Sequence, residues 1–377
     1  MNITLPEDSQ QLLSSEVYIG IAILLTIVPV VGFFENAVVI LVFFKNRHLR
    51  KSCNLYITGL AICDVLHCTI GMPMVTVSGY ARGWIFQQKG CAYYGFVTTF
   101  LGITQITILT VIAVDRYKTM RAKYVSKCKS DMKRCVLILL ACYCHGFIWA
   151  IFPLAGWSSF QIDDARLSCC ISFASKAPLD ISYLICLTFF GYIIPVVCIT
   201  SSYCGIHHVM RKNSSKVFRN RNSSTEKMFS LETSITITVF FMIVCFLISW
   251  TPYAIVSIVT ALMNPKSIPT FGKTLPGIFA KCSAIWNPIV YVIRNSEFRE
   301  SLTLTLFRIP CHTQIKTRSI GTNSNFTSGD ARVKHLSSSI ESIPSKPLNG
   351  QGIFTITCLE DIPCLTKTFQ NQSVSYR

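Results

Sequence analysis

Charged residues are scarce in this chain, and acidic residues are the scarcest of them. Only 14% of the 377 residues are charged, whereas a soluble domain averages roughly a quarter. Asp and Glu number 18 against 35 Lys and Arg, which gives a net charge of +17. Hydrophobic residues make up 51% of the chain, and the mean hydropathy is +0.46. This composition argues against a soluble domain and indicates a membrane protein.

Long apolar stretches recur along the chain, and each reaches the roughly 20 residues that a helix needs to cross a bilayer. They predict an all-α membrane protein, a seven-transmembrane helix bundle within residues 17–308. The spans are expected at 17–44, 53–78, 90–114, 134–155, 180–209, 233–262 and 271–293. After the last span, residues 294–308 have the pattern of a short amphipathic helix on the membrane surface.

Basic residues predict the orientation of the bundle, because cytoplasmic connectors are rich in Lys and Arg. Connectors 45–51, 116–134 and 211–221 are strongly basic, whereas each connector on the other side carries only two basic residues. A multi-pass protein of the cell membrane is expected, with its amino terminus extracellular and its carboxyl tail cytoplasmic. The basic clusters flank apolar spans instead of forming a soluble patch, which argues against nucleic-acid binding.

Both tails are polar. Residues 1–16 lack the basic segment and short apolar core of a cleavable signal peptide, so an extracellular tail is expected, with Asn2 in a glycosylation sequon. Residues 309–377 are rich in Ser and Thr and are expected to form a disordered cytoplasmic tail. Its segment HLSSSIESI offers phosphorylation sites for a receptor kinase and for shut-off by arrestin. Cys311 is a candidate palmitoylation site beside the membrane.

Most of the 18 cysteines lie within spans or face the cytoplasm, where thiols stay reduced. Three face the oxidising side: Cys91 at the outer end of the third span, and the adjacent Cys169 and Cys170 in the second outer connector. One disulfide is therefore expected, from Cys91 to a member of that pair. The other member is left as a free thiol.

Charged groups at the inner ends of two spans form a candidate switch. Arg116 lies between Asp115 and Tyr117 at the end of the third span, and a buried arginine needs charged partners. Glu232, at the inner end of the sixth span, is placed to be a second partner, and a swing of the sixth helix would break that contact. The alternative is that these are ordinary juxtamembrane charges.

Polar residues also interrupt the spans. Asn287 and Pro288 mark a local break in the seventh span, with Tyr291 toward the cytoplasm. Asp64 and Asn36 must face the interior of the bundle instead of lipid. We expect them to share water with Asn287.

With these motifs, the chain resembles the rhodopsin-type G-protein-coupled receptors, which carry one such mark in each helix. The resemblance covers residues 17–300. It implies a seven-helix bundle that signals to a heterotrimeric G protein through its cytoplasmic face. The residues that carry it are Asn36, Asp64, Asp115-Arg116-Tyr117, Trp149, Pro195 with Tyr203, Trp250-x-Pro252 and Asn287-Pro288-x-x-Tyr291.

Lys281 stands in the apolar run FAKCSAIWNPIVY, about two helical turns outside Pro288 and so near mid-membrane. A bare ammonium is costly to desolvate there. The residues alone leave three interpretations: a partner of a carboxylate, a contact for an anionic ligand, or an amine that forms a Schiff base with an aldehyde. A lysine at this place before Asn-Pro resembles the opsins, which implies retinal, 11-cis or all-trans, bound at Lys281.

The resemblance to opsins also implies a flat, apolar slot with aromatic walls around the lysine. Each aromatic residue taken alone would more often be plain core, but the opsin-like positions favour a ligand pocket. The residues expected to line it are Tyr94, Gly102, Cys170, Tyr192, Phe246, Trp250 and Tyr253.

A protonated Schiff base is a cation in a poor dielectric and needs an anion. In visual rhodopsins that anion is a third-helix carboxylate three residues after the cysteine, but this chain has Tyr94 there. Other opsins carry a carboxylate six residues before the bridging cysteine. That spacing selects Asp163 as counterion if Cys169 forms the bridge, which is the preferred pairing, and Asp164 if Cys170 does. The alternative is that both are solvated loop acids.

Tyr94, the connector carboxylate and residues 267–291 resemble the neuropsin group of non-visual opsins. This implies that light isomerises retinal and changes G-protein activation, with the inhibitory G-protein class as partner by analogy. If Cys169 forms the bridge, Cys170 lies over the polyene and its thiolate could add to retinal transiently. A neuropsin-like branch of this kind binds all-trans-retinal, is active in the dark and is switched off by light. The alternative is a buried, inert thiol.

Two other functions stay open. A retinal photoisomerase would have no need of an activation switch, so the intact switch residues argue against it. A receptor for a diffusible ligand would use Lys281 only as a polar contact. No catalytic residue and no metal site is predicted, and a receptor is expected instead of an enzyme.

Overall fold

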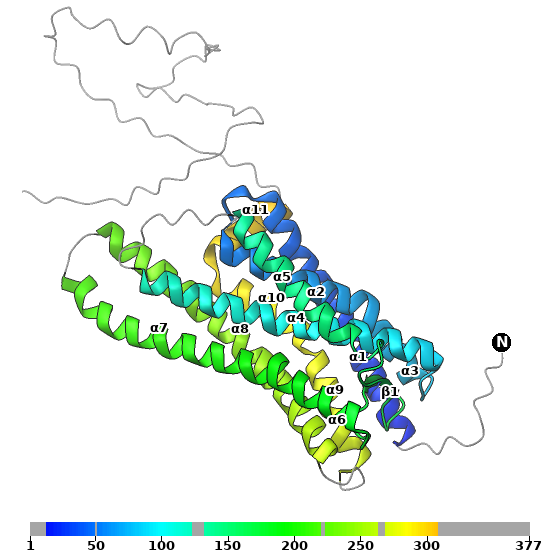
Figure 1. The fold of residues 1–377 in the computed structure, drawn as a ribbon. Helices are drawn as coiled ribbons and strands as arrows, with labels where there is room; N and C mark the ends of the chain where they lie inside the picture. The colour runs from blue at the N-terminus through cyan, green and yellow to red at the C-terminus, as the bar shows by residue number, and fades with distance from the viewer. Residues whose placement is uncertain (1–12, 50, 123–131, 220–222, 263–267, 308–377) are drawn as a thin grey trace, which may run out of the picture. The chain divides into compact units, whose positions relative to one another are not determined.

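The computed structural model describes residues 13–49, 51–122, 132–219, 223–262 and 268–307. In this part of the chain the helices lie side by side in the predicted bundle (Figure 1). They are α1 (Ser15–Lys45), α2 (Ser52–Leu66), α3 (Met72–Tyr80), α4 (Gln87–Arg121), α5 (Met132–Ile151), α6 (Pro178–Thr188), α7 (Ile194–Arg219), α8 (Ser223–Leu262), α9 (Thr270–Lys281), α10 (Ser283–Arg294) and α11 (Ser296–Phe307).

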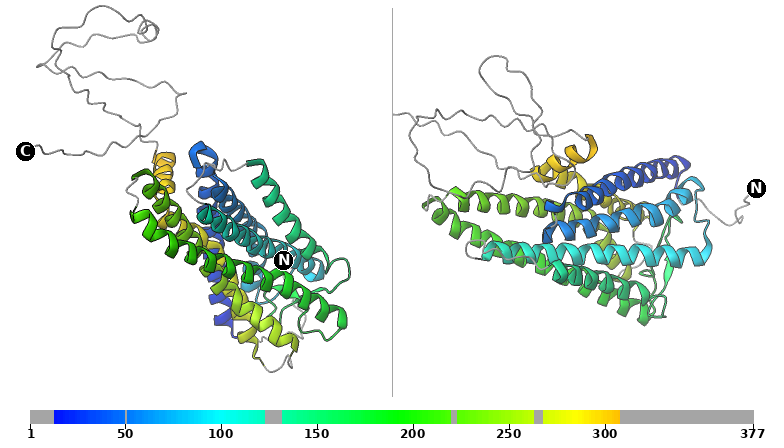
Figure 2. Two further views of the ribbon diagram at one scale, coloured as in Figure 1. Left: turned by 60° about the vertical axis from the view of Figure 1, so that its left-hand side comes forward. Right: turned by 90° about the horizontal axis from the view of Figure 1, so that it is seen from above.

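The central helix of the bundle is α4. It packs against α2, α5, α7 and α8, so segments far apart in the sequence meet along it (Figure 2). Large apolar side chains point outward elsewhere, for example Phe34 at 63% and Leu137 at 66% exposure. Six helical stretches of the described residues are long and apolar enough to cross a membrane. A lipid environment would cover this outward apolar surface.

Three of the predicted spans are built from two helices each. The π-helical turn η2 (His67–Gly71) joins α2 to α3, and the π-helical turn η3 (Phe189–Ile193) joins α6 to α7. The predicted span 271–293 is formed by α9 and α10, which meet at Cys282. The predicted position of the local break, at Asn287 and Pro288, is wrong, because α10 continues through both residues.

Prolines leave backbone carbonyls without a donor, because proline has no N–H. Pro288 frees the carbonyl of Ala284, and Asn36 Nδ2 donates to it at 2.9 Å. The carbonyl four residues before Pro29 accepts a hydrogen bond from Thr76 Oγ1. Polar side chains thereby tie α1 to α10 and α3 to α1, where an unpaired group in a bilayer would cost several kcal/mol, on the order of a lost hydrogen bond.

Between α5 and α6 lies a short antiparallel hairpin, which the all-α prediction did not include. Its strands are β1 (Phe160–Ile162) and β2 (Cys169–Ile171), and their register sets Gln161 opposite Cys170. Phe160 packs on Gly95 of α4, where any Cβ would collide with its ring. This close fit holds the hairpin against α4.

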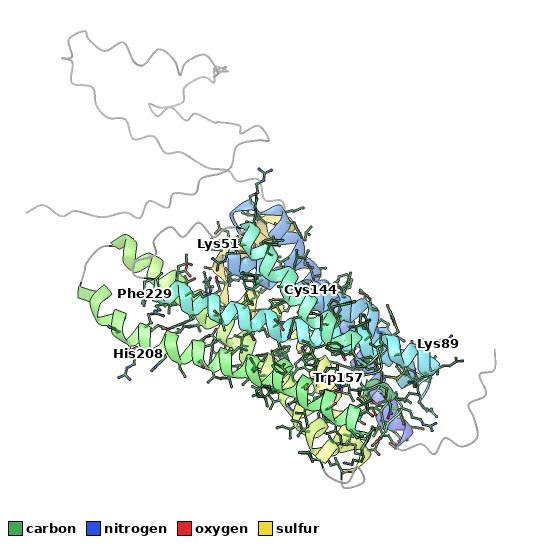
Figure 3. All side chains as sticks on the ribbon, viewed as in Figure 1. Lys51, Lys89, Cys144, Trp157, His208 and Phe229 are labelled. Carbon is green, nitrogen blue, oxygen red and sulfur yellow. A yellow bond between two sulfur atoms is a disulfide. The ribbon has the colours of Figure 1, made fainter. Side chains whose placement is uncertain are left out.

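The connectors at the two ends of the helices differ. Lys51, between α1 and α2, lies at the opposite end of the bundle from Lys89 at the start of α4 (Figure 3). The predicted basic connector 211–221 is largely helical, because α7 continues to Arg219 and α8 begins at Ser223. The predicted amphipathic helix corresponds to α11.

Two predicted segments fall mostly or wholly outside the described residues. The tail 309–377, with Cys311, follows the last described residue. Residues 1–12, with Asn2, precede the first. Their predicted roles stay predictions.

Replacing Gly146 with Ala should destabilise the bundle. A Cβ there would collide with Thr104 Oγ1 and come within 2.6 Å of the Phe100 carbonyl, a backbone atom that cannot swing aside. Overpacking of this kind costs about 1–3 kcal/mol. The expected result is a lower midpoint of thermal unfolding in detergent. Gly20→Ala is the control, since nothing lies within 4 Å of its Cβ; equal midpoints for the two variants would contradict the packing.

Candidate functional site

Lys281 is the last residue of α9, and its side chain lines an internal cavity of about 240 Å³. The helix breaks directly after it, at Cys282. Its Nζ donates one hydrogen bond, to the carbonyl of Gly277 one turn earlier, at 3.3 Å. An ammonium group has three donors, so this contact leaves the nitrogen available to a ligand.

Aromatic side chains of α8 form one wall of the cavity. The rings of Phe246 and Trp250 are stacked with centroids 5.7 Å apart, and Tyr253 meets Trp250 edge-on at 6.3 Å. Trp250 Nε1 donates to Ser283 Oγ of α10 at 3.2 Å. The wall is therefore apolar toward the cavity and is hydrogen-bonded to the segment that follows Lys281.

Three further predicted residues shape the slot. A Cβ at Gly102 would lie 3.0 Å from the Trp250 ring, so the missing side chain lets this ring approach α4 closely. The hydroxyl of Tyr192, in η3, lies 2.5 Å from Thr251 Oγ1, which fixes its ring against α8. Tyr94 of α4 is 1% exposed and also lines the cavity.

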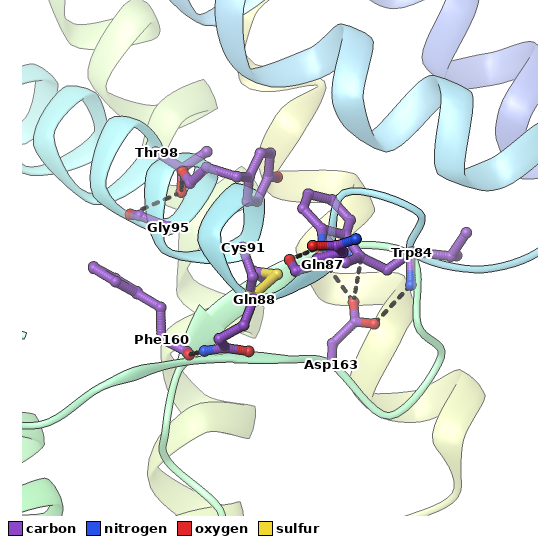
Figure 4. Close-up of a disulfide and its surroundings, with 12 residues drawn as sticks. Trp84, Gln87, Gln88, Cys91, Gly95, Thr98, Phe160 and Asp163 are labelled. Carbon is purple, nitrogen blue, oxygen red and sulfur yellow. Dashed lines mark hydrogen bonds between the residues drawn. A yellow bond between two sulfur atoms is a disulfide. The ribbon is translucent and has the colours of Figure 1, made fainter. Parts of the chain in front are cut away.

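The β1–β2 hairpin contributes another wall. A disulfide joins Cys169 in β2 to Cys91 in α4, which confirms the preferred pairing (Figure 4). Cys170 is a free thiol that lines the cavity. Burial raises the pKa of this thiol far above its ordinary value, so it carries its proton at neutral pH.

Asp163 is anchored inside the hairpin loop. Its carboxylate accepts hydrogen bonds from the backbone N–H of Leu167 at 2.8 Å and from the N–H and hydroxyl of Ser168 at 3.2 and 2.8 Å (Figure 4). Burial raises the pKa of Asp163 above its ordinary value, although these hydrogen bonds and the charge of Lys281 act in the opposite direction. Asp163 is therefore a partly buried acid that lines the same cavity as Lys281.

Asp164 has a different environment. It forms an ion pair with Lys273 of α9, and its side chain is 47% exposed. This acid already has a partner and is well solvated, so it is less suited than Asp163 to balance a charge inside the cavity.

All ten residues predicted for the pocket and its counterion line this one cavity. Sequence reasoning missed others that line it, among them His67, Thr98 and Lys273. An ionisable residue inside a predicted span is itself a signal of function, and His67, at 5% exposure in η2, carries that signal. Thr98 gives no comparable signal in the sequence.

Away from the cavity, Arg116 joins α4 to α8. It is 6% exposed, and its guanidinium donates to Glu232 at 2.9 Å and to Asp115 at 2.6 Å. The ring of Tyr117 packs on Gly205 of α7, where a Cβ would collide with it. The structure thus brings the predicted charges of the switch together in a paired arrangement.

A second polar cluster lies inside the bundle. Asn287 Nδ2 donates to Asp64 at 3.2 Å, and Gln105 Nε2 donates to the other carboxylate oxygen. The contact between Asp64 and Asn287 is direct, and Asn36 donates to a carbonyl of α10. The shared water stays a prediction. The hydroxyl of Tyr291 donates to an asparagine of α2 at 3.0 Å.

Comparison with known proteins places the chain among receptors of this architecture. Residues 35–291 match the model of the 7 transmembrane receptor (rhodopsin family). The chain is 28% identical over 302 residues to rhodopsin of Enteroctopus dofleini and 30% identical over 289 residues to melanopsin-B of Xenopus laevis. These matches cover 77% and 76% of this chain but only 65% and 54% of those proteins, so the chain spans less than two thirds of their length.

A third relative has a similar length. The visual pigment-like receptor peropsin of Homo sapiens is 29% identical over 300 residues, covering 80% of this chain and 88% of that protein. Among solved structures, the crystal structure of squid rhodopsin matches with a TM-score of 0.73 and 25% identity, covering 81% of this chain and 90% of that one. The predicted fold and the resemblance to opsins are confirmed; closeness to the neuropsin group stays a prediction.

Replacing Glu232 with Gln should loosen the contact between α4 and α8. The change removes one charge of the pair with Arg116, and a hydrogen bond to a charged group is worth about 1.5–3 kcal/mol. We expect a larger fraction of molecules in which the ends of α4 and α8 that carry Arg116 and Glu232 lie apart. Double electron–electron resonance measures this distance between spin labels on unnatural amino acids that replace Lys118 and Ser230. Glu297→Gln, which removes an exposed ion pair, is the control; identical distance distributions for both variants would show that Glu232 does not hold the helices together.

Proposed function

Because the chain belongs to the rhodopsin family of seven-transmembrane receptors, we propose that it is a non-visual photoreceptor of the opsin type. Lys281 holds retinal through a Schiff base, and light changes the activation of a heterotrimeric G protein. One observation carries the proposal: the primary amine of Lys281 ends α9 facing a cavity with aromatic walls. A desolvated lysine amine is the kind that condenses with a carbonyl.

The residues around the cavity fit retinal, a long apolar aldehyde with one reactive end. Phe246, Trp250 and Tyr253 offer flat apolar surface, and Lys281 supplies the amine. Gly102 lets the Trp250 ring lie close to α4. When bound, retinal supplies a light-absorbing polyene whose isomerisation changes its shape. The side chains orient it and exclude water.

Asp163 is proposed as the counterion of the Lys281 nitrogen in its cationic form. Three hydrogen bonds hold its carboxylate in place, and it lines the same cavity as Lys281. Asp164 is engaged by Lys273. A hairpin acid would thereby supply the charge that Tyr94 cannot.

The switch would connect the cavity to the G protein through side-chain contacts. The Trp250–Ser283 hydrogen bond links the ligand wall to α10, which also carries Asn287. At the far end, the contact between Arg116 and Glu232 holds α8 against α4. A displacement of α8 that breaks this pair would open the face on which a G protein binds. In the predicted orientation that face is cytoplasmic, where a receptor kinase and arrestin would act on the tail.

Two finer assignments go with the proposal. The inhibitory G-protein class is the proposed partner, by analogy with other opsins. A reverse photoreceptor, active in the dark with all-trans-retinal, is the second candidate, because the free thiol of Cys170 lines the cavity. The raised pKa of that thiol opposes rapid addition to the polyene, since the thiolate is the nucleophile.

The other candidate functions are less well supported. A retinal photoisomerase would make no use of the pair between Arg116 and Glu232. A receptor for a diffusible ligand would use Lys281 as a polar contact, but the aromatic wall beside it fits an apolar ligand better than an anionic one.

Replacing Lys281 with Arg should abolish the pigment, because a guanidinium keeps the charge but does not form a Schiff base. Wild-type protein incubated with retinal in the dark is expected to gain a visible absorption band, and borohydride should leave a retinyl group on Lys281, detected by mass spectrometry. Lys273→Arg changes the other lysine of the cavity and should keep both signals. A visible pigment in Lys281→Arg would end the proposal; a pigment without light-dependent nucleotide exchange on a G protein would indicate an isomerase.

Asp163→Asn should destabilise the protonated pigment, because the cation loses its counterion. The visible band is expected to vanish at a pH lower by one unit or more, roughly the effect of removing a close opposite charge. Because the pKa of Asp163 is raised, the wild-type counterion should itself become neutral at a less acidic pH than an ordinary aspartate does. Absorption spectra over a pH series measure both effects. Asp164→Asn should behave as wild type; the reverse ranking of the two variants would move the counterion to Asp164.

Cys170→Ser tests the reverse mode. If the sulfur adds to the polyene, the wild-type loss of visible absorption after a flash should accelerate as pH rises, because burial keeps the thiol protonated at neutral pH. The variant should lack this phase, and Cys186→Ser, another free thiol, should retain it. Recovery kinetics that are the same in Cys170→Ser and wild type rule out the adduct.

A further inference from the structure

His67 is a buried polar residue that the proposed mechanism does not use. It lies in the π-helical turn η2 and is 5% exposed. Its Nε2 is buried, and within the described part of the chain it has no hydrogen-bond partner. An imidazole nitrogen without a hydrogen-bond partner in a bilayer-spanning segment costs free energy. This cost points to a role of His67 toward a group inside the cavity.

Gly71 has no side chain, and this leaves room for the ring of His67. A Cβ at Gly71 would lie 3.0 Å from Cδ2 and 3.6 Å from Nε2 of His67, and 3.5 Å from the methyl carbon of Thr98. The imidazole therefore lies over Gly71, toward α4. It lines the same cavity as Lys281.

The other polar groups near this end of the cavity are already engaged or differ in chemistry. Asp64, one turn away on α2, accepts hydrogen bonds from Asn287 and Gln105. Asp163 accepts three hydrogen bonds in its own loop. The titratable groups that line the same cavity are Lys281, Tyr94, Asp163 and Cys170. The elements that contact η2 add Glu35 of α1 and Asp64 of α2, and η2 itself carries Cys68. Glu35 Oε2 also has no hydrogen-bond partner among the described residues, but Glu35 does not line the cavity.

We propose that His67 is the intramembrane hydrogen-bond acceptor and proton acceptor for the nitrogen of Lys281, reached directly or through one water. With its own proton on Nδ1, the ring offers the lone pair of Nε2. In the transfer, an N–H bond of the Lys281 nitrogen breaks, its electron pair stays on that nitrogen, and a new N–H bond forms at Nε2. The positive charge moves to the imidazolium. For the retinal-bound protein, this assignment rests on the proposed function. For the free amine of Lys281, it does not depend on retinal binding.

The first test uses the ligand-free protein. Lys281 is methylated with formaldehyde and a borohydride reductant at fixed pH, and the rate is followed by mass spectrometry. In His67→Met, Lys281 should be methylated roughly tenfold faster. The unprotonated amine is the form that reacts, and the ammonium form loses a hydrogen-bond acceptor that stabilised it by about that factor. His67→Gln, whose amide oxygen also accepts, should stay close to wild type. His145→Met is the matched control, since both nitrogens of His145 are bound by Thr107 and Trp149.

The second test uses protein loaded with retinal in the dark. The visible band of His67→Met should be lost at a pH about one unit lower than in wild type, and His67→Gln should restore the wild-type value. Gly71→Ala should shift the ring by a few tenths of an ångström without changing its chemistry, because the new Cβ would lie 3.0 Å from Cδ2. Both readouts should then move in the direction of His67→Met, by less. If no variant forms a pigment, the photoreceptor proposal fails while the labelling rates still decide the role of His67. Wild-type labelling rates in His67→Met would overturn the assignment, whatever the pigment does.

Discussion

Inside the hydrocarbon of a bilayer no water is available to a polar group, so each must find its partner within the protein. This constraint explains most of the contacts that tie the helices together. Asn36 binds the carbonyl that Pro288 leaves free, and Arg116 is paired with two acids. Against this background, the polar groups with unused capacity are informative, and two of them, the amine of Lys281 and the Nε2 of His67, face the same cavity.

Much of this arrangement could be predicted from the sequence. Hydropathy located the spans, because each must be apolar along about 20 residues, and the spacing of Lys281 from Pro288 located the amine. A break in the seventh span was predicted at Asn287 and Pro288, because proline interrupts helical hydrogen bonding. The interruption lies at Cys282 instead, where the sequence has no Pro or Gly to mark it. The hairpin also gave no local signal. Its three-residue strands depend on the disulfide to α4 and on the fit of Phe160 against Gly95, which are tertiary contacts.

The two acids of the hairpin show why neighbouring residues can be hard to rank from sequence. Asp163 and Asp164 have the same chemistry and adjacent positions, so the sequence left the choice to the pairing of the cysteines. In the fold one turns into the loop and receives three hydrogen bonds, while the other meets Lys273 at the surface. The position of the His67 ring was also hard to predict from sequence. It depends on the room left by Gly71, one helical turn further along the chain.

The interruption after Lys281 has an evolutionary consequence. The seventh span consists of α9, which carries the amine, and α10, which carries Asn287 and Tyr291, and the two helices meet at Cys282. Substitutions in α9 can therefore change the surroundings of the amine while leaving the contacts of α10 intact. Selection could then adjust the cavity and the polar cluster as two separate parts of one span.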